Sequence, residues 1–574
     1  MNDVTSLSKK LKKLISRYEH SSFLAHWSFF ANMHYRNKRE GESQLLSPVR
    51  QIMYIISLYH STGFGGRKHF EAVGKEYEMI VSLLNKIEKT YSAPSETGYD
   101  EDRETGEKLF ISSSTFLNYY LNAPLSYMEQ DIERIRQTFI HFEPYIIEQC
   151  GLGIEDFIDF YILISDLEIQ QYNNYYDHTM AEKELIIKAL QTGAALTEEE
   201  KLRLIDLADK GVMGLAIPIA RLKESIESKK IELLLSYFTM LRDNDEKYLY
   251  YTDTCPYLTK PVLLVNSGHI AFVYSKQLIN AVYDFLFELC SEIDGTGRRV
   301  LWQRENYLEY KTEEIFRNFL GPEARIHTNY LINNSEKDLI ILLPTCAFIV
   351  ECKANKYRIP FRDPIKAYER IKDDFKKSIG KAHLQAHEVK QYFLEGRKFE
   401  ISDQKGNRVE TINPQNYQQV FSIIVTQERF GQIQCNLGHL LEIEKGESFP
   451  WAVSLDDLET FLLTLNRKTC HIQEFIAFLN HREKLHGRLY CFDELELCAD
   501  FIMQPHKFKQ YCNLTLPVIT QGDLNFFFDD LYSAGFGFKD EINITEKPFR
   551  NLPIAAGLIE KLKLHTPQRM RKSR

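Results

Sequence analysis

Apolar residues recur at helical spacing through the first part of the chain. They lie three or four residues apart in Leu46–Tyr59 and again in Ile154–Leu167, a spacing that places them along one face of an α-helix. Thr197, followed by Glu200 and an apolar run, forms a capping box, in which two side chains satisfy free backbone N–H groups at a helix start. Residues 1–245 are therefore expected to form a helical accessory or regulatory domain.

The segment from Ala93 to Lys108 interrupts this pattern. Its sequence, APSETGYDEDRETGEK, is acidic and poor in large aliphatic residues, so it can bury little apolar surface. We expect an exposed loop here. We also expect the basic tail RMRKSR at 569–574 to be frayed.

From about residue 255 the chain changes to short apolar runs separated by turns. Pro261–Val265 and Ile270–Tyr274 flank an Asn-Ser-Gly sequence and predict a β-hairpin, and Leu278–Cys290 predicts a helix. The elements that follow have the order helix, three strands, helix, strand. They are predicted at Asn306–Leu320, Arg325–Ile332, Asp338–Leu343, Phe348–Lys353, Pro364–Leu394 and Val420–Thr426.

Beyond about residue 460 the pattern indicates helices again. Ser454 with Asp457, and Asp493 before another apolar run, are typical of helix N-caps. The chain of 574 residues exceeds what one hydrophobic core usually supports, so the sequence predicts an α+β multidomain protein. The predicted domains are a helical one at 1–245, an α/β one at 255–460 and a helical C-terminal region at 461–574.

Composition narrows the class of protein. Hydrophobic residues make up 44% and charged residues 26%, as in ordinary folded proteins. With a net charge of -9, nucleic acid would have to bind at a local basic patch. The ten cysteines include no CxxC pair, which favours reduced thiols over a disulfide framework or zinc ribbon. No secretory signal and no apolar run long enough to span a bilayer are evident, so we expect a cytoplasmic protein without membrane contact.

Three charged residues lie at the open end of the second and third predicted strands. Asp338 begins one strand, and Glu351 and Lys353 end the next, after a Pro-Thr turn. Antiparallel pairing about this turn sets Asp338 opposite Glu351 or Cys352. Glu351 and Lys353 are two residues apart in one strand and therefore point to the same face.

Two carboxylates buried together need a partner, because an unpaired buried charge is costly. Carboxylate oxygens from Asp338 and Glu351, with the backbone carbonyl of Cys352, suit a hard cation such as Mg²⁺ or Mn²⁺. Such an ion polarises a scissile phosphate and activates a bound water. Lys353 would orient that water or stabilise the charge that develops on the phosphate.

The pattern Asp338 … Glu351-Cys352-Lys353 resembles the D…(D/E)xK signature of the PD-(D/E)xK phosphodiesterase superfamily. The order of elements around it is similar to that superfamily's restriction-endonuclease-like core, and the resemblance covers roughly residues 305–455. It implies a Mg²⁺- or Mn²⁺-dependent nuclease that cuts DNA, with RNA as an alternative. Stand-alone bacterial members with large accessory domains often act in defence against phage, and the resemblance extends this expectation to the present chain.

The resemblance also implies further site residues. In many members a Glu on the first core helix completes the metal site, and Glu313 fits this position, with Glu314 as the alternative. Members often carry a Gln on the helix after the third strand, where this chain has Gln385. One departure is Lys337, which stands where the signature has proline.

A basic stretch follows the candidate site. From Lys353 to Lys381 there are ten Lys or Arg and four Asp or Glu, and such a surplus beside the site could hold phosphates. A solvated helix face is the alternative for any one of these side chains. The candidate nucleic-acid contacts are Lys356, Arg358, Arg362, Lys366 and Arg370.

His383 and His387 lie one helical turn apart, a spacing that can ligate zinc. No third ligand is evident nearby in the sequence, so we expect a surface or capping role for both. Two other interpretations of the whole chain remain open. One is a nucleic-acid-binding module that keeps the nuclease fold without catalysis, and the other is a helical scaffold that binds a second copy or a partner protein.

Overall fold

The computed structural model describes residues 4–36, 44–63, 66–72, 74–92, 103–121, 126–191, 196–242, 248–520, 522 and 524–533. The chain is a mixed α+β protein and divides into two compact units. Met1–Ala93 and Asp131–Gly297 belong to the first unit, and Pro94–Gln130 and Arg298–Glu541 to the second. None of the helices in these described ranges is long and apolar enough to cross a membrane. The expected basic tail at 569–574 lies outside the described residues.

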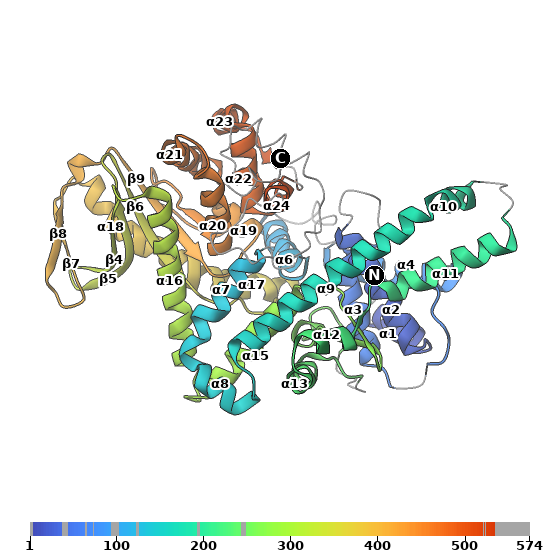
Figure 1. Ribbon diagram of the computed structural model, residues 1–574. Coiled ribbons are helices and arrows are strands. Elements are labelled where there is room, and N and C mark those ends of the chain that lie inside the picture. The colour runs from blue at the N-terminus through green and yellow to red at the C-terminus, as the bar shows by residue number, and fades with distance from the viewer. Residues whose placement is uncertain are drawn as a thin grey trace. The chain divides into compact units, whose positions relative to one another are not determined.

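The first unit is mainly helical (Figure 1). Its helices are α1 (Val4–Ile15), α2 (His20–Arg36), α3 (Pro48–His60), α4 (Gly74–Ser92), α8 (Glu143–Cys150), α9 (Ile154–Ala181), α10 (Lys183–Leu190), α11 (Glu198–Gly214), α12 (Ile219–Ser225), α13 (Ser228–Phe238), α14 (Pro256–Thr259) and α15 (Gln277–Ser291). A small sheet joins β1 (Ile217–Pro218), β3 (His269–Ala271) and β2 (Leu263–Asn266). Helix α7 (Met128–Phe139) begins in the second unit's part of the chain.

Local sequence signals account for several of these elements. The capping box is confirmed, because the Thr197 side chain accepts from the Glu200 N–H and the Glu200 carboxylate accepts from the Thr197 N–H. The predicted hairpin is confirmed as the antiparallel pair β2 and β3. Both strands and the helix after them belong to the first unit, although the sequence analysis grouped them with the α/β region.

The second unit is built around a seven-stranded mixed sheet (Figure 1). Its strand order is β10-β9-β6-β5-β4-β7-β8, with β6, β9 and β10 parallel to one another and the remaining neighbours antiparallel. The strands are β4 (Arg325–Ile332), β5 (Ser335–Leu342), β6 (Cys346–Lys353), β7 (Phe399–Ser402), β8 (Arg408–Ile412), β9 (Gln419–Thr426) and β10 (Trp451–Ser454).

The helices of this unit cover both faces of the sheet. They are α6 (Arg103–Leu121), α16 (Arg298–Leu320), α17 (Pro364–Phe375), α18 (Lys381–Leu394), α19 (Gln432–Cys435), α20 (Leu455–Leu465), α21 (His471–Arg482), α22 (Glu494–Met503), α23 (Pro505–Asn513) and α24 (Phe526–Ser533). A pair of two-residue strands, β11 (Leu489–Tyr490) and β12 (Val518–Ile519), lies among the last helices. The C-terminal helices were expected as a separate region, but residues 461–533 belong to the unit that contains the sheet.

Strand β5 is apolar on both sides because helices pack on both faces of the sheet. Leu339 and Ile341 lie in one core with residues of α16, α20, α21 and α22. Ile340 and Leu342 lie in another core, with residues of α18. The alternation of side chains along an extended strand produces this division. The charged residues of β5 all precede Leu339.

One expectation needs correction, and three strands were missed. Residues 103–108 belong to helix α6 and not to an exposed loop, and residues 93–102 of that loop lie outside the described residues. The long helix predicted over much of Pro364–Leu394 is confirmed as α17 and α18, which a π-helical turn, Lys376–Gly380, joins without a break. Strands β7, β8 and β10 were not predicted.

The predicted N-cap at Asp493 is confirmed, and its carboxyl group is buried. The side chain accepts from the Leu495 N–H at 3.0 Å and from Asn525 Nδ2 at 3.1 Å. Burial and the negative charge of Asp457 raise the pKa of Asp493 to about 7, although Arg429 opposes the shift. Asn525 Oδ1 is buried and, among the described atoms, has no hydrogen-bond partner, so a protonated Asp493 has an acceptor nearby.

We expect Asp493→Asn to stabilise the protein at pH 8 and to change its stability little at pH 4. The pKa of Asp493 is about 7 in the folded state and about 3.9 in an unfolded chain, so unfolding free energy falls as pH rises from about 4 to 7 and stays low above that. Asparagine also caps helices and carries no charge to bury. Thermal unfolding at the two pH values tests this, and an equal effect of the substitution at both would contradict it.

Candidate active site

Strands β5 and β6 bring the predicted charged residues together. Their turn is where the sequence indicated, with Leu343 N–H donating to the Cys346 carbonyl at 2.9 Å. Leu339 pairs with Val350, so the next positions on the two strands are Asp338 and Glu351. Asp338 is thus held beside the last residues of β6, at the margin of the two apolar cores.

The strand β4 is distorted directly beside Asp338. The register pairs Thr328 with Leu339 and Tyr330 with Lys337. Between these pairs lies Asn329, which has a φ of 48°, a left-handed value uncommon for any residue other than glycine. Lys337 is 2% exposed, and its ammonium contacts Glu388 of α18 at 2.5 Å.

The Lys353 ammonium contacts both Asp338 and Glu351. Asp338 Oδ2 accepts from the Cys352 N–H at 2.6 Å and lies 3.5 Å from Lys353 Nζ. Lys353 Nζ is also 3.4 Å from Glu351 Oε2 and donates to the Cys352 carbonyl at 2.9 Å. The ammonium therefore contacts all three oxygen groups that the sequence analysis assigned to a metal ion.

Burial dominates the electrostatics of this cluster. The Glu351 side chain is fully buried, and burial together with the charge of Asp338 raises its pKa to about 8, against the opposing charges of Lys353 and Lys337. The pKa of Lys353 is raised: burial alone would lower it, but Asp338 and Glu351 outweigh that effect. Without a bound cation, the Glu351 carboxyl is therefore mostly protonated at neutral pH.

Helix α16 contributes Glu309 to this charge cluster, a residue that the sequence analysis missed. Burial and the charge of Asp338 raise the pKa of Glu309 to about 7, with Lys353 opposing. Glu313, one helical turn further along, instead accepts from Arg317 at 2.6 Å. The alternative, Glu314, forms an ion pair with Lys311 at 2.9 Å. Glu309 is thus the carboxylate of α16 whose pKa the charge of Asp338 raises. Glu313 and Glu314 are instead paired with cations on their own helix.

Helix α18 carries the other predicted residues. Gln385 lies one turn before Glu388, the partner of Lys337, and its Oε1 is buried without a hydrogen-bond partner among the described atoms. His383 and His387 both approach Glu447, at 3.4 Å and 2.5 Å. The two histidines are therefore engaged with a carboxylate from a distant loop.

The candidate phosphate contacts lie after β6 and along α17. Arg358 is exposed but forms ion pairs with Asp373 and Asp374, both at 2.6 Å. Arg370 donates to the Ile359 carbonyl at 2.6 Å. Lys356, Arg362 and Lys366 are exposed. Arg358 and Arg370 of the basic stretch thus bind groups within the protein.

The residues of this cluster fit a hard divalent cation. Among the described residues, no group of three or more His, Cys, Asp or Glu side chains is close enough to hold a metal ion alone. Mg²⁺, however, commonly binds through one or two carboxylates and completes its shell with water and substrate phosphate. Glu351 Oε1 is buried and has no hydrogen-bond partner among the described atoms, as expected of an oxygen that serves as a ligand.

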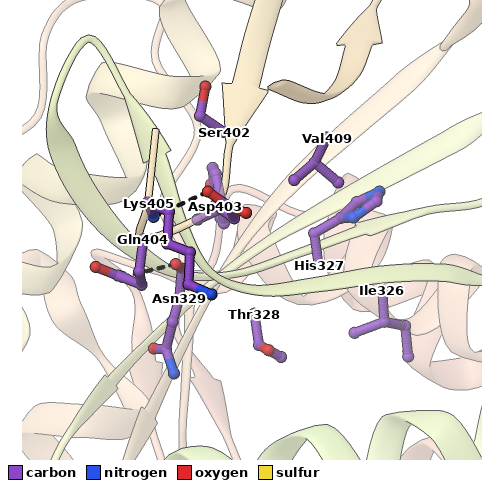
Figure 2. A pocket seen from close by; sticks show the side chains of 10 residues that line it. Ile326, His327, Thr328, Asn329, Ser402, Asp403, Gln404, Lys405 and Val409 are labelled. Carbon is purple, nitrogen blue, oxygen red and sulfur yellow. Dashed lines mark hydrogen bonds between the residues drawn. The ribbon is translucent and has the colours of Figure 1, made fainter. Parts of the chain in front are cut away.

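A cavity of about 390 Å³ opens between β4 and the turn that joins β7 to β8 (Figure 2). It is lined by residues 326–330, 402–405 and 409. Gln404 Nε2 donates to the Asn329 carbonyl and to Glu336 Oε1, both at 2.8 Å, and Figure 2 shows the bond to Asn329 at one side of the cavity. The cavity therefore borders the distorted residue that lies beside Asp338.

In comparisons with known proteins, no protein family, curated protein or solved structure matches this chain.

Proposed function

We propose that the second unit is a metal-dependent nuclease of the PD-(D/E)xK type, cutting phosphodiester bonds of DNA. Asp338, Glu351 and the Cys352 carbonyl would hold Mg²⁺ or Mn²⁺, which supplies Lewis-acid activation of the phosphate and of a water. Lys353 would then donate to the attacking water or to the charged phosphate oxygens. A role in defence against phage remains part of this proposal, by analogy alone.

One observation carries the proposal: two strands bring Asp338, Glu351 and Lys353 into one contact group around a fully buried carboxylate. Burying several charges together is costly unless a partner ion offsets the cost. Such a cluster therefore indicates a function. The order α16, β4, β5, β6, α17 and α18, then β9 parallel to β6, supports a restriction-endonuclease-like core. The exposed Lys356, Arg362 and Lys366, which follow β6 in the chain, support DNA as the substrate.

A nucleic-acid-binding module without catalysis is the second candidate. It is favoured by the position of the Lys353 ammonium, which already contacts Asp338, Glu351 and the Cys352 carbonyl. In such a module the lysine would neutralise the carboxylates permanently. Salt-sensitive DNA binding without cleavage would support this second function.

Cleavage assays on the full chain separate the two functions. Linear duplex, circular duplex, single-stranded DNA and RNA should be incubated with Mg²⁺, Mn²⁺ or Ca²⁺, and with EDTA. We expect cleavage of DNA in Mg²⁺ or Mn²⁺ and none in EDTA. Absence of cleavage from all four substrates would exclude the nuclease for these substrate classes.

We expect Glu309→Gln to lower metal-dependent turnover by about 10- to 100-fold, the scale of losing one charged group that acts on the site. The reason is that Glu309 interacts with Asp338 and Lys353. Glu313→Gln is the matched control on the same helix, because Glu313 pairs with Arg317. We expect it to keep turnover within a few-fold of the unsubstituted chain.

Single-turnover rates for both variants decide between the two glutamates. A large loss in Glu313→Gln with none in Glu309→Gln would return the role to the residue that the superfamily resemblance implied.

A further inference from the structure

The first turns of α16 expose a tryptophan to solvent. Trp302 is 59% exposed, and Leu301 beside it is 42% exposed. The other two tryptophans of the chain, Trp27 and Trp451, are buried at 0% and 3% exposure. Tryptophan has one of the largest apolar surfaces among the side chains, so a ring left in water is available to a partner that covers it.

Helix α16 packs along β6 and runs in the opposite direction to that strand. Phe316 packs against Phe348, with ring centroids 6.4 Å apart. One turn earlier in the helix, Thr312 Oγ1 accepts from Cys352 Sγ at 3.6 Å. Going back along the helix thus leads toward the carboxyl end of β6, where Lys353 of the candidate site is the last residue.

The first turns of α16 reach beyond that end. Arg304 pairs with Glu428 at 2.6 Å. Glu428 follows β9, whose last residue, Thr426, lies beside Lys353 in the parallel pairing of β9 with β6. Because Trp302 precedes Arg304 by two residues, it lies near the carboxyl ends of both strands.

Trp302 and Glu309 lie on the same side of α16. They are seven residues apart, which is about two turns and about 10 Å along the helix axis. Glu309 in turn lies one turn before Thr312, which contacts β6. At about 3.4 Å for each stacked nucleotide, a base on the Trp302 ring would lie about three nucleotides from a phosphate at the candidate site.

Exposed arginines accompany the ring. Arg298 and Arg299 precede Trp302 by four and three residues, and both are exposed, so they lie on its side of the helix. The first eight residues of α16, RRVLWQRE, contain one acidic residue, Glu305. An aromatic ring beside cations matches the chemistry of a nucleic-acid strand, whose bases stack on aromatic rings and whose phosphates bind arginine.

We propose that Trp302 is a stacking platform for an unpaired nucleobase of the bound DNA, and that Arg298 and Arg299 bind the phosphates beside that base. The base must be unpaired, because a base inside a duplex is already stacked between its neighbours. The inference rests on the proposed function, since it places the bound strand at the candidate site. It specifies the substrate class as single-stranded DNA or duplex DNA with a single-stranded end.

Intrinsic fluorescence of the full chain tests the platform, because Trp302 is the exposed one of the three tryptophans. We expect a single-stranded oligothymidylate, titrated in Ca²⁺, to quench the emission and to protect it from acrylamide, since a stacked base covers the indole ring. A blunt duplex of the same length should do neither. Equal quenching and protection by both would overturn the assignment to an unpaired base.

Three variants test the ring, with affinity measured by the anisotropy of a labelled oligothymidylate. Trp302→Leu should weaken binding about tenfold or more, the effect of losing one base–aromatic stack. Trp302→Phe should restore most of the affinity, because phenylalanine still stacks. Phe492→Leu is the matched control, since Phe492 is 58% exposed and lies between β11 and α22, and its affinity should not change. Equal losses in Trp302→Leu and Phe492→Leu would overturn the platform.

Failure of this inference is distinguishable from failure of the proposed function. If the unsubstituted chain cleaves DNA and Trp302→Leu keeps its affinity, the platform is wrong and the nuclease stands. If the oligothymidylate quenches the emission but no substrate is cut, the nuclease is wrong and the platform stands in a binding module. Absence of DNA binding by the unsubstituted chain overturns both. A changed sedimentation coefficient of Trp302→Leu with unchanged DNA binding would assign the ring to contact with a second copy and overturn the platform.

Discussion

Asp338→Asn is expected to reduce metal-dependent DNA cleavage by about 10³-fold or more, at the upper end of what one charge-stabilising group contributes. Asparagine keeps an oxygen that can accept from the Cys352 N–H, the bond that Asp338 makes at 2.6 Å. It removes the charge that Lys353 and a metal ion require. The fold should persist, because Lys353 still has Glu351 as a second carboxylate partner after the Asp338 charge is removed. Cleavage rates in Mg²⁺ and thermal unfolding of the same preparation test both statements.

Asp363→Asn is the control for this substitution. Asp363 caps α17 by accepting from the Lys366 N–H at 2.9 Å, and asparagine caps a helix equally well. Turnover in this variant should equal that of the unsubstituted chain. Full activity in Asp338→Asn would remove the candidate site altogether.

Lys353→Met is expected to lower turnover by about 100-fold or more while DNA affinity in Ca²⁺ changes by only a small factor. Methionine keeps most of the aliphatic stem but deletes the ammonium, which contacts Asp338 and Glu351. If Asp338 and Glu351 hold the metal ion, the lysine acts on the reacting water or phosphate and contributes little to ground-state binding. Lys445→Met, at an exposed position, is the control.

The two readouts distinguish the possible roles of Lys353. A large loss of DNA affinity with much of the turnover retained would make it a phosphate anchor. An increase in Mn²⁺ affinity without loss of turnover would make it a competitor for the carboxylates and not a participant in the reaction.

The pairing of β5 with β6 could be predicted from sequence because both are apolar runs bounded by charged residues and joined by a Pro-Thr turn. The shorter strands could not. The four-residue β7 and five-residue β8 alternate with exposed polar residues, a pattern shared by many loops. Strand β10 runs directly into the cap of α20 at Ser454, so its sequence carries a helix signal as well.

The candidate site was predictable in part, for a related reason. Asp338, Glu351 and Lys353 lie close together because one turn fixes the register of two adjacent strands. Glu309 lies on helix α16. The rotation of this helix relative to the sheet is set by the packing of residues such as Leu308 and Phe316, and local sequence patterns do not predict that rotation. Asn329, with its left-handed φ, interrupts β4 in a sequence that has no glycine there.

The parallel pairing of β6 with β9 has a consequence for the order in which the second unit folds. Strands β4, β5 and β6 follow one another through short turns, so their pairing closes small loops at low entropic cost. Strand β9 joins them only after the long excursion through α17, α18, β7 and β8, a non-local contact of the kind that slows folding. We therefore expect Asp338, Glu351 and Lys353 to meet early, in a nascent three-stranded meander. Helix α17 would acquire its final position later, when β9 closes the sheet.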